Sequence, residues 1–310
     1  MEKFDLIIVG GGPAGMTAGI YSARAGMKVL LLEKAGVGGQ VAQTTEIENY
    51  PGFSKIDGFS LSQNMFEQMT NLGVETKFIP VDKVELEGKE KKIIAGGVTY
   101  IASAVILSMG ASSRGLGVPS ERKYIGKGLS YCATCDGNFF RGKNVAVVGG
   151  GNTALQDVLY LSPLVKSVLL IHRRDVFRAD EVTLNDYNKQ LHEKGSNLSE
   201  KLFYTVVDLF GEGKLEGVKV RNVNTGVEED ISLDGVFVAI GRNPQTDILD
   251  GAITLDDQGY IEVKDDMSTN LSGVYAAGDI VHKSLRQIAT AVSDGAVAGT
   301  QASVYVKRNR

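Results

Sequence analysis

The chain has 310 residues, of which 43% are hydrophobic and 23% charged, and its formal net charge is −4. This composition excludes a mainly disordered chain and argues against a basic nucleic-acid-binding protein. Two cysteines are too few for a secreted disulfide scaffold, and no run approaches the roughly 20 apolar residues of a membrane helix. Acidic residues near the N-terminus interrupt any signal-peptide pattern, so we expect a cytoplasmic protein with no nucleic-acid or membrane partner. The length predicts two domains.

A strand, a glycine-rich turn, a helix and a second strand are predicted in that order at the N-terminus. Residues 6–9 form a short, continuous apolar run, which is typical of a parallel strand buried on both faces. The turn occupies residues 10–15, the helix residues 16–25 and the second strand residues 28–33. This succession is one βαβ unit.

The first turn has the spacing Gly10-x-Gly12-x-x-Gly15. In a dinucleotide site the first glycine allows the tight turn, the second lets the backbone approach a pyrophosphate, and the third lets the helix pack on the strand. An acid at the end of the second strand can bind ribose hydroxyls. The alternative is a glycine-rich turn that holds no ligand. The candidate dinucleotide-binding residues here are Gly10, Gly12, Pro13, Ala14, Gly15 and Glu33.

The same unit is repeated in the second half of the chain, after a predicted helix over residues 59–72 and a predicted strand over residues 100–107. Two dinucleotide folds in one chain agree with the length. The repeated elements are a strand over residues 144–148, a turn over residues 149–154, a helix over residues 155–161 and a strand over residues 167–171.

The second turn is followed by basic residues instead of an acid. Its spacing is Gly149-x-Gly151-x-x-Ala154, and the next strand runs into His172, Arg173 and Arg174. A ribose 2′-phosphate needs cationic and preferably bidentate partners, so this pattern predicts NADPH rather than NADH. A solvated basic strand end is the alternative. The candidate residues are Gly149, Gly151, Asn152, Thr153, Ala154, His172, Arg173, Arg174 and Arg178.

Three more elements are predicted towards the C-terminus. Residues 236–241 and 273–277 have the pattern of buried strands, and the second of them runs into Gly278 and Asp279. Residues 286–306 are predicted to form a long helix, although two glycines weaken its pattern.

Both cysteines lie in one motif, Cys132-Ala-Thr-Cys135, and Asp136 follows directly. This spacing allows a small redox disulfide, and a helix start can lower a thiol pKa. Half a zinc site and two inert buried thiols are the alternatives; zinc lacks further ligands, so no metal is expected. Asp136 could move the protons of a dithiol couple, although Asp-Gly is also an ordinary turn dipeptide. His282 has no placed partner and is expected to be a surface residue.

Together these motifs resemble the low-molecular-weight bacterial-type thioredoxin reductases. The resemblance is carried by GGGPAG, CATCDG, GGGNTA, HRRDVFRA, YAAGDI and RQIATA, which occur in matching order over nearly the whole chain. It implies a homodimeric α/β enzyme that uses FAD and NADPH to reduce thioredoxin. It also implies two Rossmann-like dinucleotide-binding domains, with the NADPH domain inserted into a discontinuous FAD domain.

The resemblance divides the chain and adds cofactor residues. Residues 1–113 and 242–310 would bind FAD, and residues 114–241 would bind NADPH and carry the redox motif. Asp279 would bind the ribityl–phosphate region of FAD, and the other added residues would lie near the flavin ring. The residues added for FAD are Gly39, Gln40, Thr44, Asn49, Gly278, Asp279, Arg286, Gln287 and Ile288.

The implied electron path runs from NADPH to FAD, then to the disulfide of Cys132 and Cys135, and then to thioredoxin. Cys135 would be nearest the flavin, Cys132 would attack the protein disulfide, and Asp136 would be the acid–base. The redox motif and the second glycine turn are close in sequence, so they are not expected to meet the flavin together. We therefore expect the inserted domain to swivel on crossovers near residues 110–117 and 241–244.

The chain departs from the family pattern at Ser108-Met109-Gly110, at His282 and over residues 195–207, where strand placement is left open. Lys127, Phe139 and Phe140 fit the family's partner-docking residues only loosely. Alternative functions are a flavoprotein that acts on another disulfide partner or takes electrons from another donor, and a redox sensor without turnover.

Overall fold

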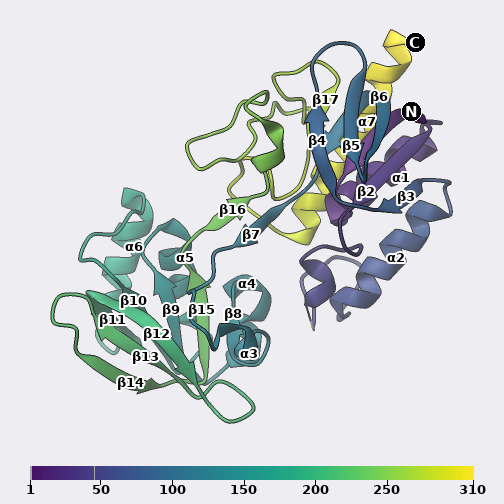
Figure 1. Cartoon of the computed structure of the whole chain (residues 1–310). Helices are drawn as coiled ribbons and strands as arrows, with labels where there is room; N and C mark the ends of the chain where they lie inside the picture. Colours follow the sequence, from purple (N-terminus) through teal and green to yellow (C-terminus); the bar gives the residue numbers. More distant parts are fainter. Residues whose placement is uncertain (1, 45) are drawn as a thin grey trace. The chain divides into compact units, whose positions relative to one another are not determined.

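The computed structural model describes residues 2–44 and 46–310. The chain divides into two compact units, one running to Ser112 and resuming at Asn243–Arg310, the other formed by Ser113–Arg242 (Figure 1). We call them the outer unit and the inserted unit. Each contains a parallel sheet with helices packed on it, so the predicted α/β class with one Rossmann-like unit inserted into another is confirmed.

The outer unit is built on a seven-stranded sheet in the order β3-β2-β1-β6-β5-β4, with β17 also paired to β6. The pairs β2–β3, β1–β2, β1–β6 and β6–β17 are parallel, whereas β4, β5 and β6 are antiparallel neighbours. The strands are β1 (Glu2–Val9), β2 (Val29–Glu33), β3 (Glu75–Phe78), β4 (Val81–Glu85), β5 (Lys91–Ala95), β6 (Val98–Leu107) and β17 (Val274–Ala276).

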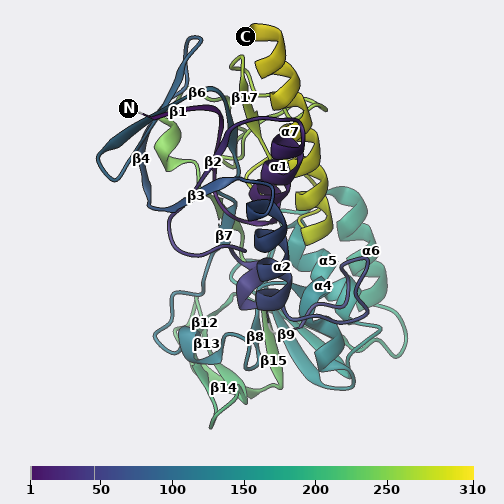
Figure 2. The same ribbon diagram turned by 90° about the vertical axis from the view of Figure 1, so that its right-hand side faces the viewer.

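Both faces of this sheet are covered, which explains why its central strands are continuously apolar. One face packs against α1 (Pro13–Arg24), α2 (Gly58–Thr70) and α7 (Ile288–Asn309). On the other face, side chains of β1, β2 and β6 pack with those of β4 and β5, the antiparallel strands of the same sheet, and with the segment that contains η3 (Asp247–Leu249). α7 runs alongside α1 (Figure 2). A Cβ atom at Gly295 would collide with the Ala14 carbonyl oxygen, so the glycines that weaken the helix pattern permit this close packing.

The inserted unit has a five-stranded, fully parallel sheet in the order β11-β10-β9-β15-β8. A separate antiparallel sheet has the order β12-β13-β14. The parallel strands are β8 (Leu129–Ser130), β9 (Asn144–Gly149), β10 (Ser167–His172), β11 (Leu198–Leu202) and β15 (Gly235–Ala239), and the antiparallel strands are β12 (Tyr204–Phe210), β13 (Gly217–Asn222) and β14 (Glu228–Ser232).

The five-stranded sheet separates two cores. Val145, Val147 and Phe237 pack with α5 (Asn152–Leu161) and α6 (Glu181–Leu191). Residues of the opposite pleat pack against β12 and β13, so the antiparallel sheet covers the other face (Figure 1). The remaining short helices are η1 (Val41–Gln43), α3 (Glu121–Tyr124), α4 (Ala133–Asp136) and η2 (Gly137–Phe140).

Two short strands lie where the chain passes between the units. They are β7 (Ala111–Ser113) and β16 (Arg242–Pro244), and they pair with each other. The Arg114 amide also donates to the Gly241 carbonyl over 2.9 Å, and the Gln245 amide donates to the Gly110 carbonyl over 3.0 Å. The two passages of the chain therefore form one ribbon.

Most predicted elements are present with shifted ends. The predicted strand over residues 236–241 stops at Ala239, because Gly241 has φ +113° and cannot continue the strand. The predicted helix over residues 286–306 begins at Ile288, where the Gln287 side chain forms a capping box with Thr290. Residues 195–207, left open in sequence, contain β11 and the start of β12. The antiparallel strands β4, β5 and β12–β14 were not predicted.

Candidate active site

The two cysteines form a disulfide at the start of α4. Cys132 is the N-cap residue in extended conformation, and the Cys135 amide donates to its Sγ atom over 3.2 Å. The Cα atoms are 5.3 Å apart, Cys135 is exposed and Cys132 is half-buried. A single helical turn thus places the exposed Cys135 beside Cys132, whose sulfur accepts a backbone N–H. This arrangement suits a redox disulfide rather than two inert thiols.

Asp136 closes the same turn and is partly buried. Its amide donates to the Cys132 carbonyl over 3.1 Å. Burial raises the pKa of Asp136, and a hydrogen bond from the Ser130 hydroxyl opposes the rise. The distance from Ser130 Oγ to Asp136 Oδ2 is 2.6 Å. A raised pKa brings the carboxyl group closer to neutral pH, which suits a group that gives and takes protons.

A buried carboxylate supports the residue before Cys132. Glu121 is only 8% exposed and accepts the Tyr131 hydroxyl over 2.7 Å. It also accepts the amides of Leu116 and Gly117 over 2.7 and 3.0 Å. Burial and Glu121 together raise the pKa of Tyr131, so this phenol remains a donor. Glu121 therefore ties the segment that follows β7 to the redox turn.

In the outer unit, the first glycine turn has the shape that a pyrophosphate needs. Gly10 has φ +105°, and a Cβ atom there would collide with the Ser108 carbonyl. Gly12 is the N-cap of α1, followed by Pro13, and no atom lies within 4 Å of where its Cβ would be. The helix N-terminus, with its free amides, therefore faces open space in which an anion can be held.

Segments far apart in sequence gather around this turn. The Glu33 carboxylate accepts the Gly11 amide over 2.7 Å. Gly278 lies so close to Ala14 that a Cβ atom on it would be 2.8 Å from the Ala14 Cβ. The remaining contacts are made by Gly39 beside Gly12, by Gln40 bonded to the Ala111 carbonyl, and by Asn49, whose amide donates to Gln287 over 3.1 Å.

A partly buried arginine near these segments has a donor to spare. The Arg286 guanidinium lies 4.1 Å from the centre of the Tyr260 ring, and its Nη1 donates to the Lys283 carbonyl over 3.0 Å. Its Nε atom is buried with no hydrogen-bond partner. Ile288 starts α7 two residues later, Asp279 directly follows Gly278, and Thr44 follows η1. The open glycine turn and this free donor fit a bound dinucleotide.

The second glycine turn lies between β9 and α5 in the inserted unit. A Cβ atom at Gly149 would collide with the Ala239 carbonyl, and Gly151 caps α5 with space around it. Asn152 Oδ1 accepts the Asp180 amide over 2.6 Å, and Thr153 and Ala154 follow in the first turn of the helix. The Arg178 amide donates to the Gly150 carbonyl over 2.7 Å. The segment after β10 therefore folds back onto the turn.

The basic residues after β10 divide into two kinds. The His172 ring packs on Gly150 and stacks on Phe177, with ring centres 5.4 Å apart. Burial is the main reason that its pKa falls below the ordinary value, so the ring is neutral at pH 7 and supplies shape rather than charge. Arg173, Arg174 and Arg178 are exposed beside the turn and can meet a phosphate.

Sequence reasoning missed several supporting residues. Ser130, Glu121 and Asp294 carry no local motif. Asp294 accepts the Gly278 amide over 3.0 Å and Lys283 Nζ over 2.5 Å. His282 is on the surface as expected, but it has a partner: its Nδ1 lies 2.6 Å from Asp256. The only sequence signal for these contacts is that an acidic and a basic residue occur on segments that could face each other.

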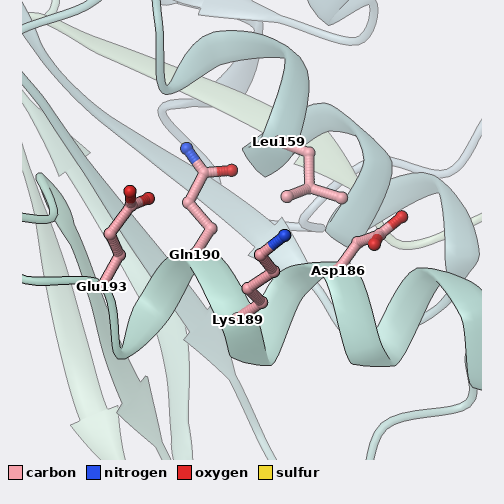
Figure 3. Close-up of a pocket in the computed structure, with 5 residues that line it drawn as sticks. All are labelled: Leu159, Asp186, Lys189, Gln190 and Glu193. Carbon is pink, nitrogen blue, oxygen red and sulfur yellow. The ribbon is translucent and has the colours of Figure 1, made fainter.

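A hollow of about 380 Å³ lies elsewhere in the inserted unit, between α5 and α6 (Figure 3). Its lining residues are Leu159, Asp186, Lys189, Gln190 and Glu193. None of them was predicted as a site residue. Within residues 2–44 and 46–310, no helix is long and apolar enough to cross a membrane. The same residues contain no cluster of three or more His, Cys, Asp or Glu side chains that could hold a metal.

Comparison with known proteins agrees with this geometry. Residues 4–295 match the model of the pyridine nucleotide-disulphide oxidoreductase family. The thioredoxin reductase of Mycolicibacterium smegmatis is 44% identical over 97% of this chain and 96% of its own length. That of Bacillus subtilis is 42% identical over 98% and 95%. The crystal structure of thioredoxin reductase from Streptococcus pyogenes is similar with a TM-score of 0.91 and 38% identity, covering 99% of both chains.

A disulfide at a helix start, a partly buried acid beside it and two glycine turns at helix N-termini thus occur together in a chain that matches these enzymes over nearly its full length. We conclude that the chain belongs to the pyridine nucleotide-disulphide oxidoreductase family.

Proposed function

We propose that the chain is an NADPH-dependent thioredoxin reductase, in which FAD and the Cys132–Cys135 disulfide carry the electrons. The observation that carries this proposal is the disulfide at the N-terminus of α4 with Asp136 in the same turn. Two dinucleotide-shaped turns in one chain supply a place for each cofactor. The similarity to enzymes named thioredoxin reductase supports the choice of substrate.

FAD would be held in the outer unit. The amides at the start of α1 would face its pyrophosphate, Glu33 would approach the ribose and Asp279 the ribityl chain. Arg286 would offer its free Nε–H, and Gln40, Asn49 and Gln287 would lie near the ring. The chemistry that bound FAD supplies is the transfer of an electron pair from a reduced nicotinamide to a disulfide.

NADPH would be held in the inserted unit. The amides at the start of α5 would face its pyrophosphate. Arg173, Arg174 and Arg178 would pair with the 2′-phosphate, because their charged groups are exposed beside the turn. His172 would shape the turn through its contact with Gly150.

The reduced cysteines would exchange with the disulfide of thioredoxin. The Cys132 thiolate attacks one substrate sulfur, and the substrate S–S bond breaks as a mixed disulfide forms. Cys135 then attacks Cys132 Sγ, which reforms the enzyme disulfide and releases the reduced substrate. Two electrons leave the enzyme dithiol, and Asp136 would take up and return the thiol proton.

Assembly and location belong to the same proposal. We propose a homodimer formed through the outer unit, where Tyr21 of α1, Phe59 of α2 and Phe78 of β3 are exposed aromatic side chains. A cytoplasmic location follows from the need for NADPH. The mass of the purified protein in solution tests the first point.

The central test is oxidation of NADPH by the purified yellow protein with and without thioredoxin. We expect rapid NADPH consumption only when thioredoxin is present, and little use of NADH. Cys132→Ser and Cys135→Ser should each abolish turnover while FAD stays bound. Bound flavin reduced by NADPH without turnover of thioredoxin would overturn the choice of partner, and failure of NADPH to reduce it would overturn the choice of donor.

The nucleotide preference has its own matched pair of variants. Replacing Arg173 and Arg174 together by Ala should raise the KM for NADPH about tenfold or more and leave the KM for NADH unchanged. Arg122→Ala removes an exposed arginine of α3 in the same unit and is the control. If the Arg173 and Arg174 variant changed the KM for NADPH and the KM for NADH equally, these arginines would not recognise the 2′-phosphate.

A further inference from the structure

Ser130 connects both ends of the redox turn. It is 5% exposed at the end of β8, two residues before Cys132. Its Oγ donates to Asp136 Oδ2 over 2.6 Å and accepts the Cys132 amide over 3.0 Å. The Cys132 carbonyl oxygen lies 3.3 Å from the same Oγ atom. One hydroxyl therefore touches the acid and the backbone of the half-buried cysteine.

With these partners, the Ser130 hydroxyl keeps its hydrogen bonds whether Asp136 is protonated or ionised. A serine hydroxyl has one proton to donate and two lone pairs that accept. When Asp136 is ionised, the hydroxyl donates to the carboxylate. When Asp136 is protonated, the carboxylic acid donates to Oγ, and the serine proton turns to the Cys132 carbonyl. In both states the Cys132 amide remains bonded, so neither the Ser130 hydroxyl nor this amide is left without a partner.

The surroundings of Asp136 make this support important. α4 packs against α5 and η2, and of these only α5 carries ionisable side chains, Asp157 and Tyr160. Burial and Ser130 are the two influences on the pKa of Asp136, and no cation within residues 2–44 and 46–310 adds to them. A buried carboxylate without a compensating cation depends on its hydrogen-bond donors.

We propose that Ser130 is the positioning residue for Asp136, holding its carboxyl group against the redox turn in both protonation states. This inference rests on the proposed role of Asp136 as acid–base. It assigns a task to a residue with no catalytic motif. Ser130 acts through Asp136 and does not itself react.

The test uses the FAD-bound protein with its disulfide reduced by dithiothreitol and then desalted. The reduced protein reacts with 5,5′-dithiobis(2-nitrobenzoate) in place of thioredoxin. Cys132 attacks the reagent and releases one aromatic thiolate, and Cys135 displaces the second. The enzyme disulfide reforms, two thiolates carry away the electron pair and two protons are released. The rate is followed against pH, which needs neither NADPH nor a protein partner.

We expect the wild-type rate to fall towards acid pH as the Cys132 thiolate is protonated, with a second limb where Asp136 becomes protonated; Asp136→Asn should lose only that second limb. Ser130→Ala removes the donor that stabilises the carboxylate, so the second limb should move to higher pH by about one unit. Ser130→Thr keeps the hydroxyl and should restore the wild-type profile. In the Asp136→Asn background, Ser130→Ala should cause no further change.

Ser162→Ala is the matched control, because Ser162 is also 5% exposed in the inserted unit and donates to Asn197 over 2.6 Å. It should lower stability without moving the profile. A Ser130→Ala profile that coincides with wild type, while Asp136→Asn loses the second limb, would overturn the positioning role alone. An Asp136→Asn profile that keeps the second limb would overturn the acid–base role itself, and the positioning role with it.

If Ser130→Ala does not fold, the unfolding temperature of a combined variant is measured in place of the rate. An unpaired neutral amide costs less than an unpaired carboxylate, so Ser130→Ala combined with Asp136→Asn should fold even where Ser130→Ala alone does not. A combined variant that also fails to fold would show that Ser130 supports the fold other than through Asp136, and the inference would be wrong.

Discussion

The glycines in the first turn of the outer unit have two different roles. Gly10 is required by the backbone, since its φ of +105° and the nearby Ser108 carbonyl leave no place for a side chain. Gly12 has φ −75° and free space around it, so the fold alone does not demand glycine there. The absence of a side chain at Gly12 therefore points to a ligand that needs the space.

The first prediction follows from this contrast. Gly12→Ala should leave the unfolding temperature of the FAD-free protein unchanged but weaken FAD binding by at least about tenfold, because the methyl group would occupy the place of the pyrophosphate. Titration of the FAD-free protein with FAD measures the effect. Gly36→Ala is the control, since Gly36 has equally open surroundings and no positive φ. Equal FAD affinity in the two variants would contradict the assignment.

A second prediction at this scale concerns Asp157 on α5. Burial raises the pKa of Asp157 to about 7 from the ordinary 3.8, against a lowering influence of Arg242. At pH values between these two, the folded chain holds a proton on Asp157 that the unfolded chain has lost. This contribution to stability is therefore complete below pH 4 and is lost as the pH rises through 7. Asp157→Asn should melt with wild type below pH 4, should already melt at a higher temperature than wild type at pH 5, and should reach its full advantage of several degrees by pH 8.

Thermal unfolding at several pH values measures this difference. Asp186→Asn, which changes an exposed acid of α6, should show no such dependence on pH. A constant difference between Asp157→Asn and wild type across the range would mean that Asp157 does not titrate near neutrality.

At the scale of elements, the redox turn is held from outside by Glu121. The carboxylate joins the segment after β7 to Tyr131, and Tyr131 directly precedes Cys132. The same unit contains a second bond of this type, in which the buried Tyr187 donates to Glu200 over 2.9 Å. The two bonds are chemically alike but only one adjoins the cysteines.

This pair gives the third prediction. Tyr131→Phe and Tyr187→Phe should each reduce the free energy of unfolding by about 1 kcal/mol, because each loses one buried hydrogen bond to a carboxylate. Only Tyr131→Phe should also slow thiol–disulfide exchange, since it loosens the backbone at Cys132. Chemical denaturation and the rate with oxidised thioredoxin measure the two effects. If both variants lost the same amount of rate, the hydrogen bond to Glu121 would contribute only to general stability.

The elements that were predicted correctly are those whose signal is local. Residues 6–9 and 144–148 are short apolar runs next to glycine turns, and such runs are typical of parallel strands covered on both faces. β5 and β14 lack this signal: β5 alternates and buries Lys91, and most of β14 is exposed. Pairing with neighbours in the folded chain determines these strands, so no local pattern reveals them.

The candidate site divides in the same way. The glycine turns and the cysteine pair are spacing motifs, and the structure forms both turns at helix N-termini and joins the cysteines. The bond between Asn49 and Gln287 spans 238 residues, and that between Ser120 and Asp208 spans 88. Side chains brought together over such separations cannot be identified from one sequence without a family resemblance.

At the scale of the whole molecule, the redox disulfide and the second glycine turn both follow strands of the same five-stranded sheet in the inserted unit. Cys135 precedes Gly149, the last residue of β9, by 14 positions, and β8 and β9 both pair with β15. A disulfide and a nicotinamide held in this unit must each approach a flavin held in the other. Because neither can move far within the unit, we expect the unit itself to move between two positions.

The fourth prediction tests that movement. A chemical cross-link that joins Ser113–Arg242 to the rest of the chain, located by mass spectrometry, should abolish turnover while FAD stays bound. The linked protein should retain at most one half-reaction, either flavin reduction by NADPH or disulfide reduction by the flavin. Rapid-mixing absorbance measurements distinguish these. Full turnover in the linked protein would contradict the expected movement.

The ribbon of β7 and β16 has a consequence for how such a protein can change over time. The chain leaves the outer unit at Ser112 and returns at Asn243, and the Ser112 Oγ lies 3.5 Å from the Asn243 carbonyl oxygen. Cutting out the intervening residues would leave ends that a short turn could join, because they already sit in one ladder. The whole inserted unit can therefore be gained, lost or exchanged at this ribbon, and the seven-stranded sheet of the outer unit would keep all of its strands. Descendants of one ancestor could thus acquire a different electron donor without rebuilding the cofactor site that receives the electrons.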